Sequence, residues 1–313
     1  MRDSYDEFNT KGESRIMKDS ISRKIFNIFN ICFFILLMAT MLFPYFNVLA
    51  KALNEGKDTA MGGILLLPRK FTWENFETVI MDKNFGRALF ISVSMTVVCT
   101  VANLCVQFMA AYTLLNKDLV GRKALMIFLL IPMYFGGGLI PQYILYSKIG
   151  LLNNFLVYVL PGLMSTYNTI IIRSYMESVP PSLRESARID GANDIRIAFQ
   201  IMLPLSKPVL ATVALWTAVG AWSNWTQTLY FVTKKELFTL QYVLMQVIKE
   251  AEKLRAMVAE AALRGEILNI VPTVTSESVQ SAQIIVTTLP IILVYPFLQK
   301  YFIQGVTLGA VKD

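Results

Sequence analysis

Few side chains in this sequence have the chemistry needed for covalent catalysis or for binding a metal ion. Its 313 residues include no histidine, and its three cysteines, Cys32, Cys99 and Cys105, lie in long apolar segments where buried, inert thiols are expected. Zinc sites with cysteine and histidine ligands and Ser-His or Cys-His nucleophiles are therefore excluded. The chain also lacks the G-x-x-x-x-G-K-[ST] loop that cradles nucleotide phosphates. We predict no catalytic residue, no metal site and no cofactor bound by this chain.

One hydrophilic stretch stands out in this apolar chain, ESARIDGANDIRIAFQIMLP, which begins at Glu185. Upstream of it, two prolines end the preceding apolar segment, and Ser182-x-x-Glu185 has the spacing of a capping box that starts a helix. Gly191 can take the left-handed conformation that ends this helix, and Asn193 can cap a second helix that runs through 199–203. The sequence therefore predicts a helix-turn-helix elbow.

The two predicted helices of the elbow differ in the surfaces they would present. The first carries small residues, Ser186, Ala187 and Ala192, that let another surface come close. The second, 195–203, is richer in apolar side chains than exposure to solvent favours. One face could pack on the rest of the protein and leave the other for a partner, but an amphipathic connector at a lipid interface would have the same pattern. Both interpretations stay open at this point.

Long apolar segments must position this elbow, because 55% of the residues are hydrophobic and only 16% are charged. A helix needs about 20 mostly apolar residues to cross a bilayer. Six segments without charge meet this need, at 25–50, 88–116, 124–147, 149–172, 208–233 and 278–299. We therefore predict an all-α polytopic membrane protein with six transmembrane helices. The absence of charge inside these spans argues against a proton-driven carrier, although backbone carbonyls could still hold sodium.

Lysines and arginines in short loops predict the orientation of the chain. The loop 117–123 holds three of them, and the elbow loop, 180–207, with its surroundings holds several more, so both loops should be cytoplasmic. Both termini, including the N-terminal tail 1–24, are then cytoplasmic, while 51–87 and 234–277 are extracellular. The net charge of +7 follows from these loops and does not indicate nucleic-acid binding.

The elbow also carries a resemblance to a known family. Its Glu185-Ser186-Ala187, Asp190-Gly191-Ala192 and Ile201-x-Leu203-Pro204 groups resemble the EAA loop of binding-protein-dependent ABC importer permeases, with serine in place of the usual middle alanine. The segment 67–80 and the C-terminal 288–313 are similar to carbohydrate permeases of the maltose-permease G-like class, in the LplC/YtcP branch. The similarity covers most of the chain from about the first span onward.

The resemblance implies a MetI-like permease fold over 25–313 in a bacterial plasma membrane. In that family the permease pairs with a second homologous permease, an extracellular solute-binding lipoprotein and a cytoplasmic ATPase dimer that holds ATP and Mg. The EAA elbow fits a groove on the ATPase. The resemblance assigns this coupling to Glu185, Ser186, Ala187, Asp190, Gly191, Ala192, Leu203 and Pro204. For Glu185, direct contact with the ATPase and a purely structural cap are equally compatible with the sequence.

A substrate path is suggested by the end of the fifth predicted span, which concentrates three of the four tryptophans with several polar side chains. Indole faces suit sugar rings, so Trp216, Trp222 and Asn224 are candidates for a glycan path. An interfacial aromatic belt also explains Trp222 and Trp225, whereas Trp216 lies deeper in the span. The region 249–266 should form a helix, which could touch the binding protein or act as a solvated spacer.

These features together predict a permease subunit of an ATP-binding-cassette importer, which forms half of the channel for a sugar, in particular an oligosaccharide. It would be a transport component and no enzyme, since ATP hydrolysis belongs to the partner. Two alternatives remain. One is the same machine with a non-sugar solute, and the other is a membrane scaffold whose elbow binds a cytoplasmic partner without transport.

Overall fold

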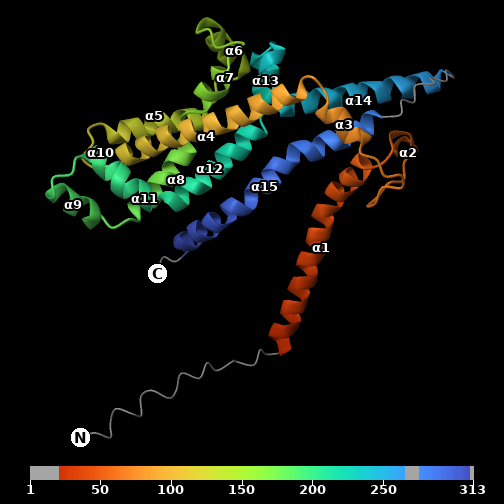
Figure 1. The fold of residues 1–313 in the computed structure, drawn as a ribbon. Helices are drawn as coiled ribbons and strands as arrows, with labels where there is room; N and C mark the ends of the chain where they lie inside the picture. Colours follow the sequence, from red (N-terminus) through yellow and green to blue (C-terminus); the bar gives the residue numbers. More distant parts are fainter. Residues whose placement is uncertain (1–20, 265–274, 311–313) are drawn as a thin grey trace.

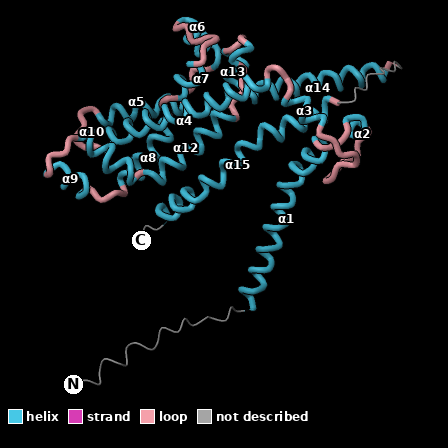
Figure 2. Tube along the Cα trace, viewed as in Figure 1, coloured by secondary structure: helices cyan, strands magenta, loops and turns pink. Residues whose placement is uncertain are grey.

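A computed structural model describes residues 21–264 and 275–310 of the chain, and these residues are mostly helical (Figure 1, Figure 2). The helices are α1 (Ile21–Ala52), α2 (Gly56–Ala60), α3 (Glu74–Ile80), α4 (Phe85–Leu115), α5 (Arg122–Tyr134), α6 (Leu139–Lys148), α7 (Leu156–Val159), α8 (Thr166–Glu177), α9 (Ser182–Ile189), α10 (Asp194–Ile197), α11 (Leu203–Leu205), α12 (Lys207–Trp222), α13 (Thr226–Phe231), α14 (Leu240–Leu263) and α15 (Ser276–Ala310). Within the described ranges there is no strand, only an isolated bridge between Asn54 and Phe71. The all-α prediction is therefore confirmed.

The centre of the molecule is a bundle in which α4 packs against α8 and α12 (Figure 1). One apolar cluster holds the part of this bundle nearest the elbow together. Its buried members come from all three helices and from the elbow itself, and they are Phe108, Ala111, Leu115, Ile172, Met176, Ile197, Ala198, Met202, Val209 and Val213. The second half of the predicted elbow is thus part of the bundle core, so it cannot move independently of the membrane helices.

The first helix, α1, runs away from this bundle, and α15 lies along part of it (Figure 1). Nearly all of its residues from Ile21 to Phe46 are exposed in the isolated chain, and its buried residues, Ala50 and Ala52, are at its C-terminal end. A helix that is apolar on every side is stable only when lipid or other protein covers it. Its surface is therefore a membrane or subunit surface.

The predicted spans correspond only partly to continuous helices. By length and composition, three of the described helices could cross a bilayer, at 21–52, 85–115 and 277–294, or up to five if each of two bent pairs is one span. The predicted span 124–147 is one of these pairs, because α5 and α6 meet at 115° around three consecutive glycines. Glycine favours such a break because it has no side chain and its backbone can adopt many conformations. The count of six spans stays a prediction that is compatible with this fold.

Two other predicted spans are interrupted. The segment 149–172 forms α7, a 3₁₀ turn at Leu160–Gly162 and α8 instead of one helix, because the Leu-Pro-Gly sequence lacks one backbone donor and resists helical continuation. The segment 208–233 contains α12, which ends at Trp222, and the short α13. Apolar composition alone did not reveal these breaks.

Three further predictions concern the helix at 249–266, the N-terminal tail and the cysteines. The helix predicted at 249–266 is confirmed over its described part, since α14 extends to Leu263. Residues 1–20, 265–274 and 311–313, which include most of the predicted N-terminal tail, lie outside the described residues. The prediction of three buried thiols is wrong, because only Cys99 is buried in this chain and Cys32 and Cys105 face outward from their helices.

Candidate functional site

The predicted elbow lies at one end of the molecule, with α9 at its outer edge (Figure 1). None of the eight residues of α9 is buried, and Ile189 at its end is 86% exposed. Gly191 follows with φ of +82°, the left-handed conformation predicted from the sequence. The Gly191 N–H donates to the Arg188 carbonyl at 3.1 Å, and the Ala192 N–H donates to the Ala187 carbonyl at 2.9 Å. These two bonds form a Schellman motif, which fixes the direction of the chain as it leaves α9.

The predicted capping box at the start of α9 is wrong. Pro181, not Ser182, occupies the N-cap position, and no side chain caps the helix there. The proline has φ of −62° and ψ of −26°, both close to helical values, so the helix is already set before Ser182 is reached. The Glu185 side chain is exposed and has no hydrogen bond or ion pair with any described residue. Its carboxylate is therefore available to a partner.

A second set of bonds joins α9 to α10. The Asn193 side chain accepts a hydrogen bond from the Arg196 N–H at 2.8 Å, which is the N-cap that the sequence predicted. Arg188 on α9 donates to the Asp194 carboxylate at 2.9 Å, and this bond raises the pKa of the Arg188 guanidinium. Both groups are more than half exposed, so the ion pair contributes little stability and mainly orients the turn.

Beyond the turn, the chain enters the bundle core. A π-helical turn, Ala198–Met202, links α10 to α11, and Ile197 and Met202 are fully buried against the bundle. The segment 194–205 then meets α12 at 78°. The elbow thus has an exposed arm, α9, and a buried arm that leads directly into a membrane helix.

The structure places the eight predicted coupling residues on both arms. Glu185, Ser186, Asp190, Gly191 and Pro204 are exposed, while Ala187, Ala192 and Leu203 are half-buried and pack against the central apolar cluster. The small side chains of Ala187, on α9, and Ala192, after the turn, let the elbow approach the core closely. The exposed residues 185–186 and 190–191 remain open to another protein.

The predicted substrate-path residues occupy different environments. Trp216 is 42% exposed, with its ring centroid 6.5 Å from that of Tyr167. Trp222 is only 6% exposed, and its indole N–H donates to the Thr287 carbonyl at 2.9 Å. Asn224 accepts bonds from the two residues that begin α13, so it orders the turn after α12. Trp222 and Asn224 therefore have structural partners, and Trp216 is the one of the three with a free aromatic face.

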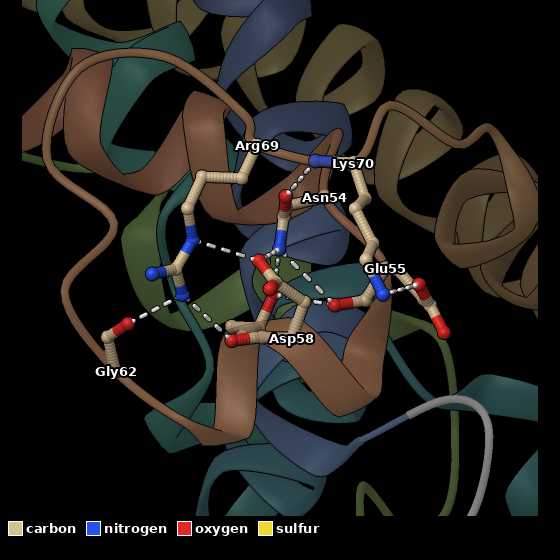
Figure 3. Close-up of polar contacts among 7 residues, drawn as sticks. Asn54, Glu55, Asp58, Gly62, Arg69 and Lys70 are labelled. Carbon is tan, nitrogen blue, oxygen red and sulfur yellow. Dashed lines mark hydrogen bonds and ion pairs between the residues drawn. The ribbon is translucent and has the colours of Figure 1, made fainter.

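At the opposite end of the molecule, a polar network orders the loop after α1 (Figure 3). The Asn54 amide, which is fully buried, donates to the Asp58 carboxylate at 2.9 Å and accepts from the Lys70 N–H at 2.8 Å. Arg69 donates to the same carboxylate at 3.0 Å and to the Gly62 carbonyl at 2.7 Å. The bonds from Asn54 and Arg69 hold the pKa of Asp58 below its ordinary value.

This network was not predicted from the sequence, although the pairing of acidic 55–58 with basic 69–70 was a visible signal. It closes the segment 54–71 into a compact loop that displays apolar side chains. Met61 is 81% exposed, and Leu67 is 79% exposed. An ordered loop with exposed apolar groups is typical of a protein contact surface.

Comparison with known proteins identifies the family to which this fold belongs. Residues 108–308 match the family described as the binding-protein-dependent transport system inner membrane component. The chain belongs to this family. The match spans the elbow, the tryptophan segment and most of α15, so the resemblance seen in the sequence is confirmed, and the protein is a membrane component of a transport system.

Individual relatives agree over nearly the whole chain. Protein LplC of Bacillus subtilis is 33% identical over 96% of this chain and 99% of its own length. The polygalacturonan/rhamnogalacturonan transport system permease protein YtcP of the same organism is 29% identical over 93% of this chain and 100% of its own length. A solved chain of a bacterial ABC transporter involved in the import of the acidic polysaccharide alginate is 28% identical and superposes with a TM-score of 0.80 over 91% of this chain and 99% of its own. The MetI-like permease fold is thus confirmed.

Proposed function

We propose that this chain forms half of the translocation channel of a carbohydrate ABC importer and that its elbow couples the channel to ATP hydrolysis by a separate ATPase. The observation that carries the proposal is the two-armed elbow. Its exposed arm, α9, is joined by a Schellman motif and an ion pair to an arm buried among α4, α8 and α12. The arrangement suits a lever between a soluble motor and a membrane bundle.

The mechanism follows from the rigidity of this connection. A displacement of α9 by the ATPase cannot be absorbed at the turn, because the two backbone bonds around Gly191 and the Arg188–Asp194 pair fix it. The displacement is passed to Ile197 and Met202, which are fully buried in the bundle core, where side chains are close-packed. Packed helices respond by rigid-body rotation or sliding, which would open one side of the channel and close the other. ATP and Mg bind to the ATPase dimer in this proposal, and not to this chain.

Import driven by a cytoplasmic ATPase requires that α9 faces the cytoplasm and that the loop 54–71 faces the extracellular side. The basic residues of the short loops support this orientation, with both chain termini on the cytoplasmic side of a bacterial plasma membrane. An extracellular solute-binding lipoprotein would then meet the compact outer loop. A second homologous permease would complete the channel, and the exposed apolar surfaces of the helices, α1 above all, are available to it.

Oligosaccharides are the proposed solutes. Two of the transport components to which this chain is similar carry the names of polysaccharides, which are polygalacturonan, rhamnogalacturonan and alginate. Within the chain, the exposed ring of Trp216 offers the flat apolar surface on which a sugar ring stacks. We place Trp216 in the path, and assign Trp222 and Asn224 to its support.

The test is reconstitution of the chain with its partner permease, ATPase and binding protein in lipid vesicles, followed by measurement of ATP hydrolysis and glycan uptake. Loading the binding protein with an oligosaccharide should stimulate hydrolysis and drive uptake, with acidic and neutral oligosaccharides compared side by side. Stimulation by a non-sugar solute and by no oligosaccharide would overturn the substrate assignment alone. Failure of the chain to copurify with any ATPase would overturn the coupling role.

A further inference from the structure

A basic hollow lies at the junction of α4 and α5, close to the elbow. None of the residues that line it belongs to the proposed coupling segment or to the substrate path. Its volume is about 580 Å³. The residues that line it are Lys117, Leu119, Gly121, Arg122, Lys123, Met126 and Ile127. Three of these seven residues are cationic and none is acidic, so an anion is favoured inside the hollow.

Two of the cationic side chains have no partner among the described residues. The side chains of Lys117 and Lys123 are exposed and form no hydrogen bond or ion pair with any residue in 21–264 or 275–310. Arg122 is held in place, because its Nε donates to the Leu114 carbonyl at 2.8 Å. The acid nearest to it, Glu177, has its Oε1 3.6 Å from Arg122 but only 2.7 Å from Arg173. One carboxylate is therefore shared by two guanidinium groups, and it neutralises the hollow only in part.

The other acidic residue near the hollow interacts electrostatically with the elbow. Asp118 lies in the same loop, and its charge contributes to the raised pKa of Arg188 on α9. With Lys117, Arg122, Lys123 and Arg173 against Asp118 and Glu177, the charged groups around the hollow leave an excess of positive charge.

Apolar side chains continue from the hollow along α5. Ile127 lines the hollow and is 52% exposed, and Phe128 beside it is 68% exposed. Val120 at the tip of the loop is 95% exposed. A cationic hollow that opens onto an exposed apolar helix face matches a molecule with a negative head and a hydrocarbon tail. A soluble anion would use the lysines but not the apolar face.

From this geometry we infer that the hollow binds the headgroup phosphate of an anionic phospholipid, with the acyl chains lying along Ile127 and Phe128 of α5. The phosphate is held by the two unpaired lysines and the fixed guanidinium of Arg122. The site is next to the elbow, so a bound lipid would stiffen the loop that carries Asp118.

The experiment uses the assembled transporter in nanodiscs with Phe128→Trp as a local fluorophore, and the unsubstituted complex supplies the background from the native tryptophans. Brominated phosphatidylglycerol or brominated phosphatidylcholine is titrated into unlabelled phosphatidylcholine, and quenching of the added tryptophan is measured. Lys117→Gln with Lys123→Gln removes the unpaired cations. Lys57→Gln with Lys83→Gln is the matched control, because these lysines are also exposed and unpaired within the described ranges but lie in the loops on the other side.

We expect half-maximal quenching at a mole fraction of brominated phosphatidylglycerol about tenfold lower than for brominated phosphatidylcholine, since each lysine near a membrane surface attracts anionic lipid severalfold. The difference should disappear in the Lys117/Lys123 variant and persist in the control variant and in the presence of excess inorganic phosphate. Equal quenching by the two lipids in the parent complex would overturn the proposal. Relief of quenching by phosphate would identify a soluble-anion site instead, and a persistent difference in the Lys117/Lys123 variant would show that another surface recruits the lipid.

Discussion

Replacement of Gly191 by proline isolates the role of the elbow. Proline holds φ near −65°, whereas Gly191 has φ of +82°, so the Schellman motif cannot form. Two backbone hydrogen bonds of about 1 kcal/mol each are lost, together with about 1 kcal/mol for the altered backbone. The sum of about 3 kcal/mol reduces the population of the native elbow by about 100-fold. The eight-residue α9 is too short to persist without its cap.

Alanine at the same position provides a graded comparison. No atom lies within 4 Å of the Cβ that alanine would add at Gly191, so the cost is conformational strain alone, about 1 kcal/mol. Both backbone bonds can remain. We therefore expect Gly191→Ala to retain most uptake and Gly191→Pro to abolish it, while the membrane helices still insert.

A matched control exists at the other end of the molecule. Gly150 ends α6 with φ of +72°, and the Gly150 N–H and Leu151 N–H donate to the Ser147 and Tyr146 carbonyls in the same Schellman pattern. Gly150→Pro therefore causes equal local damage far from α9. The assay is copurification of the ATPase with each tagged variant, alongside glycan uptake in vesicles. Loss of the ATPase in Gly191→Pro only is the expected result. Normal ATPase binding and uptake by Gly191→Pro at normal expression would refute the coupling role.

Further predictions concern topology, the substrate path and the outer loop. In a background without the native cysteines, an impermeant thiol reagent added to intact cells should label a cysteine at Lys253 and not one at Ser182; the reverse pattern would invert the orientation. Trp216→Ala should raise the oligosaccharide concentration for half-maximal uptake without lowering complex yield, and unchanged uptake kinetics would remove this ring from the path. Trp222→Ala should instead lower the melting temperature, at a cost of about 3 kcal/mol for a buried indole, with kinetics unchanged in the surviving complex. Because its pKa is depressed, Asp58 stabilises the outer loop fully at pH values above its unfolded pKa, and the contribution is lost as pH falls through the lowered folded pKa. Hydrogen exchange in the loop, corrected for intrinsic rates, should therefore show equal protection at about pH 7 and pH 5 and progressively less as the pH falls below the ordinary carboxyl pKa of about 3.9, and pH-independent protection would contradict this.

Local chemistry in the sequence was sufficient for much of the elbow. Gly191 ends a helix and Asn193 begins one because their own backbone and side chain perform these tasks within a few residues. The predicted cap at Ser182 failed for an equally local reason, since Pro181 already supplies the helical backbone that a serine N-cap would have had to precede.

The sequence by itself determined the membrane class, the all-helical fold and the family, because these depend on composition, on the length of charge-free segments and on a short motif with fixed spacing. Only the tertiary structure decided which side chains are in contact. It distinguished the exposed Trp216 from the buried Trp222, which have similar surroundings in the sequence. Trp222 donates its indole N–H to the carbonyl of Thr287 on α15, which is 65 residues away in the chain, so its environment depends on how the helices pack. The tertiary structure likewise assembled the outer-loop network and left the side chains of Lys117 and Lys123, at the basic hollow, without partners in the part of the chain that the structure describes. Helix propensity, capping and hydrophobicity act between near neighbours in the chain, whereas burial and charge pairing depend on distances in space that packing alone sets.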